Sequence, residues 1–250
     1  ICQHLEATRH GTITQLLINV PPGTSKSIIT CVCFPAWIWA TNPTKRFLFF
    51  SYSETLSIRD SIKCRDLIRS AWFQKRWPLQ MKDDRDSVTK YENNKGGWRL
   101  VGSITGKGLG EHGDFSVCDD PHNILQSESE ADRISKARWF EGVFCVRGEV
   151  RDAKRVLIMQ RLHASDCSGV ALEKGGWTHL CLPMEFEPDR KCFTDLGSGK
   201  RFEDPRVSEG DLLFPERFAG PELADLKKQL SAWGGQYAVA GQLQQSPTPR

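Results

Sequence analysis

The sequence lacks the features that mark membrane-spanning and secreted proteins. Its longest apolar run, residues 28–40, contains Thr30 and Pro35 and is shorter than the about 18–20 residues of a membrane helix, so we expect a buried helix there. No signal peptide is visible. The nine cysteines form no C-x-x-C pair, which argues against a zinc site and against a disulfide scaffold. We therefore expect a reducing, intracellular location, the cytoplasm.

The sequence also has no strong excess of charge of either sign. Its formal net charge is +3, with 26% charged and 39% hydrophobic residues, which is ordinary for a globular protein. A local basic face can exist within a near-neutral total, so the charge neither requires nor excludes a polyanionic partner. A length of 250 residues is enough for one α/β domain, or for a domain with a small extra subdomain.

Apolar segments with strand character alternate with segments of helical periodicity, and this order favours a mostly parallel sheet flanked by helices. We expect strands at residues 16–20, 46–53, 98–104, 115–119, 155–160 and 177–183. We expect helices at residues 26–40, 54–72, 128–146, 165–173, 221–232 and 236–245. Residues 74–97 are expected to be loop with a short hairpin, and residues 185–212 to be loop.

A candidate phosphate-binding loop follows the first expected strand. Residues 20–27 read Val-Pro-Pro-Gly-Thr-Ser-Lys-Ser, where the standard pattern G-x-x-x-x-G-K-[ST] has glycine at the positions of Val20 and Ser25. Backbone N–H groups at a helix start favour an anion, and a plain turn is the alternative. The predicted nucleotide-binding residues are Pro22, Gly23, Thr24, Ser25, Lys26 and Ser27.

Two adjacent carboxylates end a later strand. Asp119 and Asp120 follow the apolar residues 115–118, and two neighbouring carboxylates repel each other unless a cation is present. We expect Asp119, with Ser27, to hold Mg²⁺, and Asp120 to polarise the attacking water. The alternative is an exposed strand-end turn, which Pro121 would favour.

Two further segments have a possible part in the chemistry. Gln160 ends the strand expected at residues 155–160 and would lie near the γ-phosphate if that strand neighbours the one ending at Asp119. From spacing alone, an ordinary surface strand end is the simpler interpretation. The glycine-rich residues 105–113 are either a flexible connection or a loop that presents Lys107 to the phosphates of a neighbouring subunit.

The succession of these motifs resembles the large terminase subunit of tailed bacteriophages, the ATPase that packages DNA into proheads. The matching segments are residues 16–27, 49–61, 110–123, 156–163 and 241–249, which together span nearly the whole chain. The resemblance implies a P-loop ATPase fold of the additional-strand, conserved-glutamate type. It implies ATP and Mg²⁺ as cofactors.

The resemblance also assigns roles to residues. It implies Lys26 and Ser27 as the Walker A pair, Asp119 as the Walker B magnesium ligand, Asp120 as the catalytic carboxylate, and Gln160 in the segment that couples hydrolysis to movement. Many relatives have glycine in place of Ser25 and glutamate in place of Asp120. The trans-acting cation is not obvious, and Lys107 and Arg138 are the candidates.

We expect two units, an N-terminally trimmed ATPase domain at residues 1–213 and a closing subdomain at residues 214–250 that begins the linker to an absent nuclease domain. No nuclease activity is expected from this chain. The resemblance implies double-stranded DNA, a homo-oligomeric ring, the portal protein and the small terminase subunit as partners, in the cytoplasm of the host cell. The alternatives are another nucleic-acid translocase or helicase, and a degenerate, non-catalytic module for assembly or DNA binding.

Overall fold

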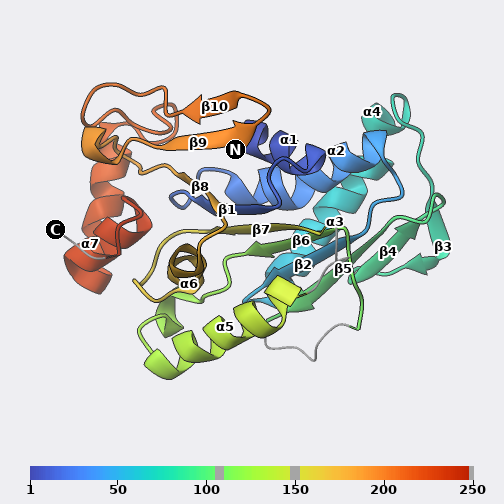
Figure 1. Ribbon diagram of the computed structural model, residues 1–250, viewed down its shortest axis with the longest axis horizontal. Helices are drawn as coiled ribbons and strands as arrows, with labels where there is room; N and C mark the ends of the chain where they lie inside the picture. Colours follow the sequence, from blue (N-terminus) through green and yellow to red (C-terminus); the bar gives the residue numbers. More distant parts are fainter. Residues whose placement is uncertain (105–109, 147–152, 248–250) are drawn as a thin grey trace.

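The computed structural model describes residues 1–104, 110–146 and 153–247. At its centre is an eight-stranded sheet in the order β3-β4-β5-β2-β6-β7-β1-β8 (Figure 1). The strands are β1 (Gln15–Asn19), β2 (Phe47–Ser51), β3 (Met81–Asp86), β4 (Lys90–Asn93), β5 (Trp98–Ser103), β6 (Phe115–Asp119), β7 (Lys154–Met159) and β8 (Thr178–Cys181). In this order, neighbouring strands from β5 to β8 are parallel. Strand β4 is antiparallel to both of its neighbours, β3 and β5. The predicted fold class is thereby confirmed.

Strand β7 lies between β1, which leads into the candidate phosphate loop, and β6, which ends at Asp119. The register pairs Asn19 with Met159 and Asp119 with Ile158. The two motif-bearing strands are therefore separated by one additional strand. This is the arrangement that the sequence resemblance implies. It brings Gln160 to the carboxyl ends of the parallel strands, the edge of the sheet at which both motifs lie.

Helices cover both faces of the sheet because the strands send alternate side chains to opposite sides. Leu16 and Ile18 pack in one core with α1 (Cys2–His10), α2 (Phe34–Thr41) and α3 (Glu54–Arg69), whereas Leu17 packs in a second core with α5 (Glu130–Gly142) and α6 (Cys167–Lys174). Figure 1 shows these two helical layers on opposite sides of the sheet. Short helices complete the elements: α4 (Ala71–Gln74) and the 3-10 turns Ile124–Gln126, Phe144–Val146 and Pro188–Arg190.

The helix after the phosphate loop differs from the expected one at its start. Residues Ile28–Cys33 form a π-helix that continues into α2. Pro35 has no N–H to donate to the carbonyl of Cys31 in an α-helical pattern. The buried Arg99 donates to that carbonyl instead, at 2.6 Å. Proline thus changes the helix, and a guanidinium from β5 satisfies the carbonyl it leaves free.

Three other expectations need correction. Residues 185–212 are not all loop, because β9 (Phe193–Gly197) and β10 (Lys200–Glu203) form an antiparallel hairpin. The helix expected at residues 54–72 ends at Arg69, and the separate short helix α4 begins at Ala71. Helix α1 had no predicted counterpart. It packs on the hairpin through the buried His4, whose Nε2 lies 2.6 Å from Thr194 Oγ1.

The C-terminal region is one helix with a break. Helix α7 (Gly220–Gln242) contains non-helical backbone at Gly234 and Gly235, which separates the two helices expected there. It has its own small core, in which Leu223 and Leu243 pack with Met184 and Phe218. The proposed division into residues 1–213 and 214–250 stays a prediction.

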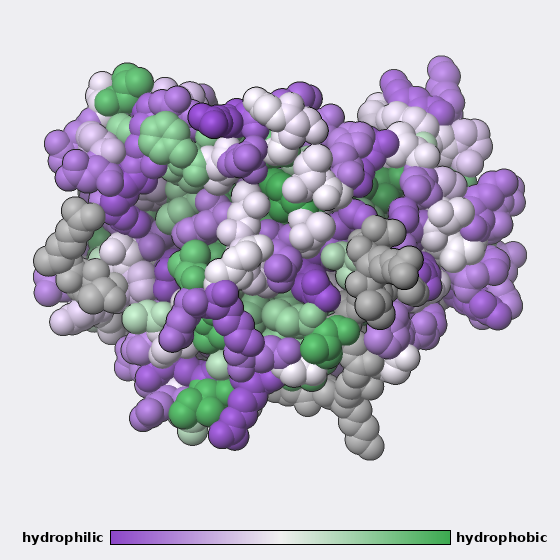
Figure 2. Space-filling model, in the orientation of Figure 1, coloured by the Kyte–Doolittle hydropathy of each residue, from purple (hydrophilic) through white to green (hydrophobic). Residues whose placement is uncertain are grey.

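The surface shown in Figure 2 is mainly hydrophilic, with hydrophobic residues in separate small areas and a hydrophilic end over the β3–β4 hairpin. No helix in the described part of the chain is long and apolar enough to cross a membrane. All nine cysteines are free thiols, as expected.

Candidate functional site

The candidate phosphate loop connects β1 to the following helix and contains strained backbone. The Thr24 hydroxyl donates to the carbonyl of Pro21 at 2.8 Å, which closes the loop. Ser25 has φ 61°, in the left-handed region that favours glycine. This is the position where the standard pattern has its second glycine. The loop thus adopts the backbone that the pattern requires, with serine in place of glycine.

Lys26 is directed from this loop to the end of β6. Its side chain is only 8% exposed, and its Nζ lies 3.6 Å from Asp120 Oδ2. Asp120 itself has φ 43°, a second strained position. Backbone contacts determine its place, since its N–H donates to Ile158 of β7 at 2.9 Å and its carbonyl accepts from Tyr52 at 3.2 Å. The lysine of one motif and the carboxylate of the other therefore meet across the edge of the sheet.

Asp119, at the end of β6, lies beside them and is partly buried. Burial, followed by the charge of Asp120, raises the pKa of Asp119 to about 7, while a hydrogen bond from Ser27 and the charge of Lys26 act in the opposite direction. Its Oδ1 is buried, and no group in the described part of the chain forms a hydrogen bond with it. Burying a carboxylate oxygen without a partner is costly, and a cation removes the cost.

The residues present fit a magnesium ion. The Asp119 carboxylate and the Ser27 hydroxyl are the hard oxygen ligands that Mg²⁺ prefers, and one carboxylate oxygen lacks a partner. The Asp60 carboxylate and the Cys31 thiol have ligand atoms within 4.8 Å of Asp119 and of each other. Asp60 is bound by Arg59 at 2.9 Å, so it is not free to bind a cation without losing that pair.

Gln160 follows β7 directly and is buried, and its side-chain Oε1 has no hydrogen-bond partner among residues 1–104, 110–146 and 153–247. Its strand lies between those of the two motifs, so the condition that the sequence interpretation set for Gln160 is met. Among the described residues, no hydrogen bond joins it to Lys26, Ser27 or either carboxylate.

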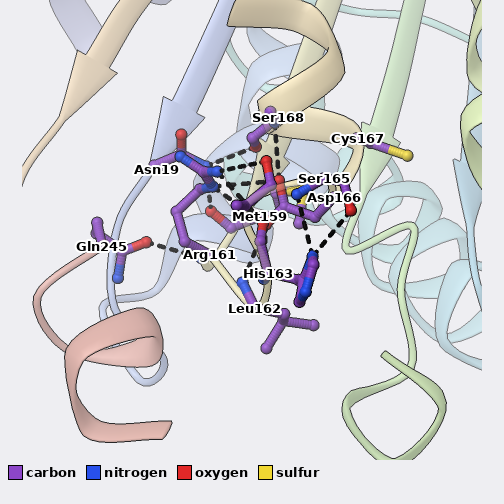
Figure 3. A network of polar contacts seen from close by, with 12 residues as sticks. Asn19, Met159, Arg161, Leu162, His163, Ser165, Asp166, Cys167, Ser168 and Gln245 are labelled. Carbon is purple, nitrogen blue, oxygen red and sulfur yellow. Dashed lines mark hydrogen bonds and ion pairs between the residues drawn. The ribbon is translucent and has the colours of Figure 1, made fainter. Parts of the chain in front are cut away.

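Arg161, the next residue, is the centre of a network of polar contacts (Figure 3). Its Nε lies 3.1 Å from both carboxylate oxygens of the buried Asp166. Asp166 also caps α6, accepting from Gly169 N at 2.8 Å. Asn19, at the end of β1, donates to the Met159 carbonyl at 3.0 Å and to Ser168 at 2.9 Å. The ends of β1, β7 and the start of α6 are thereby joined.

The C-terminal segment reaches into this network. Gln245 Oε1 accepts from the Arg161 N–H at 3.0 Å, and Gln245 Nε2 donates to the Gln242 carbonyl at 2.6 Å. Figure 3 shows Gln245 extending from the segment after α7 toward Arg161. The end of α7 is thus tied to the end of β7.

The two candidates for a trans-acting cation stay predictions. Lys107 lies outside the described residues, and Arg138 is exposed on α5. The structure instead reveals residues that no sequence pattern marked: Asp60, Asp166 and Arg217. Only the fold shows what each of them contacts.

Comparison with solved structures finds large terminases of bacteriophages. The fold is similar to that of bacteriophage large terminases. The large terminase of the thermophilic bacteriophage D6E aligns with a TM-score of 0.48 and 12% identity, over 71% of this chain and 44% of that one. The HK97 bacteriophage large terminase gives 0.48 and 11%, over 73% and 38%. The D6E large terminase in complex with ADP gives 0.45 and 13%, over 71% and 44%.

This chain spans less than half of the length of those terminases, at 38% to 44%. The likeness concerns the fold. No protein-family model and no curated protein matches the sequence.

Proposed function

We propose that this chain is the ATPase domain of a viral or prophage DNA-packaging motor. One observation carries the proposal: the lysine of a phosphate loop and two strand-end carboxylates meet at one edge of the sheet, with one strand between their own strands. This is the arrangement that binding and hydrolysis of a nucleoside triphosphate need. ATP is the proposed substrate.

In this proposal, different residues of the chain bind the phosphates, hold the metal ion and activate the water. The N–H groups of residues 22–27 and Lys26 bind the phosphates. Ser27 and Asp119 hold Mg²⁺, which would neutralise charge on the phosphates when bound. Asp120 orients the attacking water and accepts its proton, as the water oxygen forms a bond to the γ-phosphorus and the bond to ADP breaks.

Movement would be passed on through the end of β7. Gln160 would sense the γ-phosphate from the end of β7, and the Arg161 N–H donates to Gln245, which follows α7. A shift of Gln160 after phosphate release would therefore move α7 through its tie to Arg161. In a ring of such subunits, this displacement would push double-stranded DNA through the portal, with the small terminase subunit as a further partner.

Calorimetric binding of Mg-ATP to the wild-type chain and to Lys26→Ala tests the nucleotide site. We expect micromolar binding by the wild type and loss of binding by the variant. Lys45→Ala is the matched control, because Lys45 is a partly buried lysine in an ion pair with Asp114 at 3.3 Å, before β2 and away from the loop. Absence of binding by the wild type would contradict the proposal and favour the non-catalytic module.

Turnover tests the role of Asp120. Asp120→Asn should keep Mg-ATP binding and lower the hydrolysis rate by roughly 100-fold or more, the usual contribution of a positioned proton acceptor. An unchanged rate of packaging-coupled hydrolysis in the intact protein would sink the assignment. Unwinding of a forked duplex would favour the helicase alternative.

A further inference from the structure

The segment before α7 packs directly on the phosphate loop. Gly23 has φ +77°, and a β-carbon added there would lie 2.8 Å from Phe218 Cζ and 3.6 Å from Arg217 Nε. Such a short distance means that the Phe218 ring touches the loop backbone. The one glycine that the loop retains is therefore at the point where residues almost two hundred positions later in the sequence cover it.

Arg217, which precedes Phe218, lies near the loop and has no ion-pair partner among the described residues. Phe218 is buried in the core of the C-terminal region, and the N–H groups of Arg217 and Phe218 both donate to the Phe214 carbonyl, at 3.2 and 3.0 Å. The Arg217 side chain is exposed, and within the described residues it forms no ion pair. Its recorded contact is with the Phe218 ring, at 5.7 Å. The turn thus places the Arg217 side chain beside the loop at Gly23, without an ion-pair partner in the described part of the chain.

The charge balance of the site calls for another cation. Lys26, which faces Asp120, and a bound Mg²⁺ would offset the carboxylates of Asp119 and Asp120 but not the whole charge of the nucleotide. The phosphate chain of ATP brings further negative charge. A guanidinium matches the geometry of phosphate oxygens and can bind two of them at once.

We propose that Arg217 binds the phosphate chain of the nucleotide, as a cationic residue supplied by the same chain. This rests on the proposed function and goes beyond it, because neither Lys107 nor Arg138 is then needed as a cation from a neighbouring subunit. Arg217 stands just before α7, and Gln245 ties the other end of α7 to β7. One helix would therefore contact the nucleotide at its start and the coupling strand at its end.

Titration calorimetry with Mg-ATP, Mg-ADP and magnesium tripolyphosphate tests the proposal on the whole chain. Loss of a charge-assisted contact in Arg217→Ala should weaken Mg-ATP and tripolyphosphate binding by roughly tenfold or more. Arg217→Lys should recover part of that loss because it keeps the charge. Arg201→Ala is the matched control, an exposed arginine on β10 without an ion pair in the described part of the chain.

Each outcome is decisive. Weaker binding of ATP alone assigns the contact to the γ-phosphate, and equal weakening of ATP and ADP assigns it to the inner phosphates. Unchanged affinity in Arg217→Ala, with normal binding by the wild type, overturns the role of Arg217 and leaves the proposed function intact. No binding by the wild type overturns both. If Arg217→Ala lowers the melting temperature, Arg217→Gln decides instead, and wild-type affinity in that variant also overturns the proposal.

Discussion

Two regions at the same edge of the sheet differ in how their polar groups are satisfied. Around the phosphate loop, Asp119 has a buried oxygen for which the described residues supply no hydrogen-bond partner. The other region lies at the end of the adjacent strand β7, where the buried Asp166 accepts hydrogen bonds from Arg161 and from the Gly169 N–H.

The difference separates a candidate binding site from a structural contact between elements. An unsatisfied buried group costs free energy, and a bound ligand would compensate for that cost. A buried hydrogen-bond network stabilises one arrangement of the elements that it joins. The loop region is therefore the part expected to respond to a ligand, and the network is the part expected to resist change.

Asp166→Ala should have the largest effect on stability. The change leaves the buried Arg161 without a counter-charge and removes the cap of α6, so we expect a loss of about 3–5 kcal/mol in the free energy of unfolding. Urea denaturation measures it. Asp211→Ala is the control, because Asp211 also accepts from two backbone N–H groups, at 3.2 and 2.8 Å, in a partly exposed loop. Equal losses in both variants would contradict the network's special role.

Asp119→Asn should raise the free energy of unfolding of the ligand-free chain, whereas Asp166→Ala should lower it. Because the pKa of Asp119 is raised from 3.8 to about 7, the folded chain keeps a proton between these pH values that the unfolded chain has lost. The stability of the ligand-free wild type therefore falls as the pH rises through this range. At pH 8 the variant should be more stable than the wild type by on the order of 2 kcal/mol, with the gain vanishing near pH 4.

Denaturation curves between pH 4 and pH 8 measure the effect of Asp119→Asn. Asp195→Asn, at an exposed position on β9, is the control and should leave the pH dependence of stability unchanged. A variant with the same pH dependence as the wild type would show that burial of Asp119 does not strain the ligand-free site.

Ser25→Gly should have the smallest effect. Glycine adopts φ 61° without strain but loses more entropy on folding, so we expect a net gain of about 0.5 kcal/mol. Ser198→Gly, at φ 54° in the turn of the β9–β10 hairpin, is the matched control. Thermal denaturation should show similar gains in both variants, whereas Mg-ATP affinity should change only in Ser25→Gly. A loss of stability at position 25 would indicate that the serine side chain stabilises the loop.

Local sequence patterns predicted much of the fold. The alternation of strands and helices, the turn at residues 21–27 and the two carboxylates at the end of β6 follow from hydrophobic periodicity and from residue types that favour turns and strand ends. The π-helix is different, because it depends on Pro35 together with an arginine from a distant strand. The β9–β10 hairpin was missed because its strands are mostly exposed and carry no long apolar run.

The sequence by itself determined which chemical groups the chain possesses and the order in which they follow its strands. Only the tertiary structure decided that β7 lies between β1 and β6, that Lys26 reaches Asp120, and that Arg217 and Gln245 join the two ends of α7 to the loop and to β7. The physical reason is the range of the interactions. Periodicity acts over a few residues, whereas strand order and buried polar contacts depend on how distant segments pack to bury apolar surface and satisfy their polar groups.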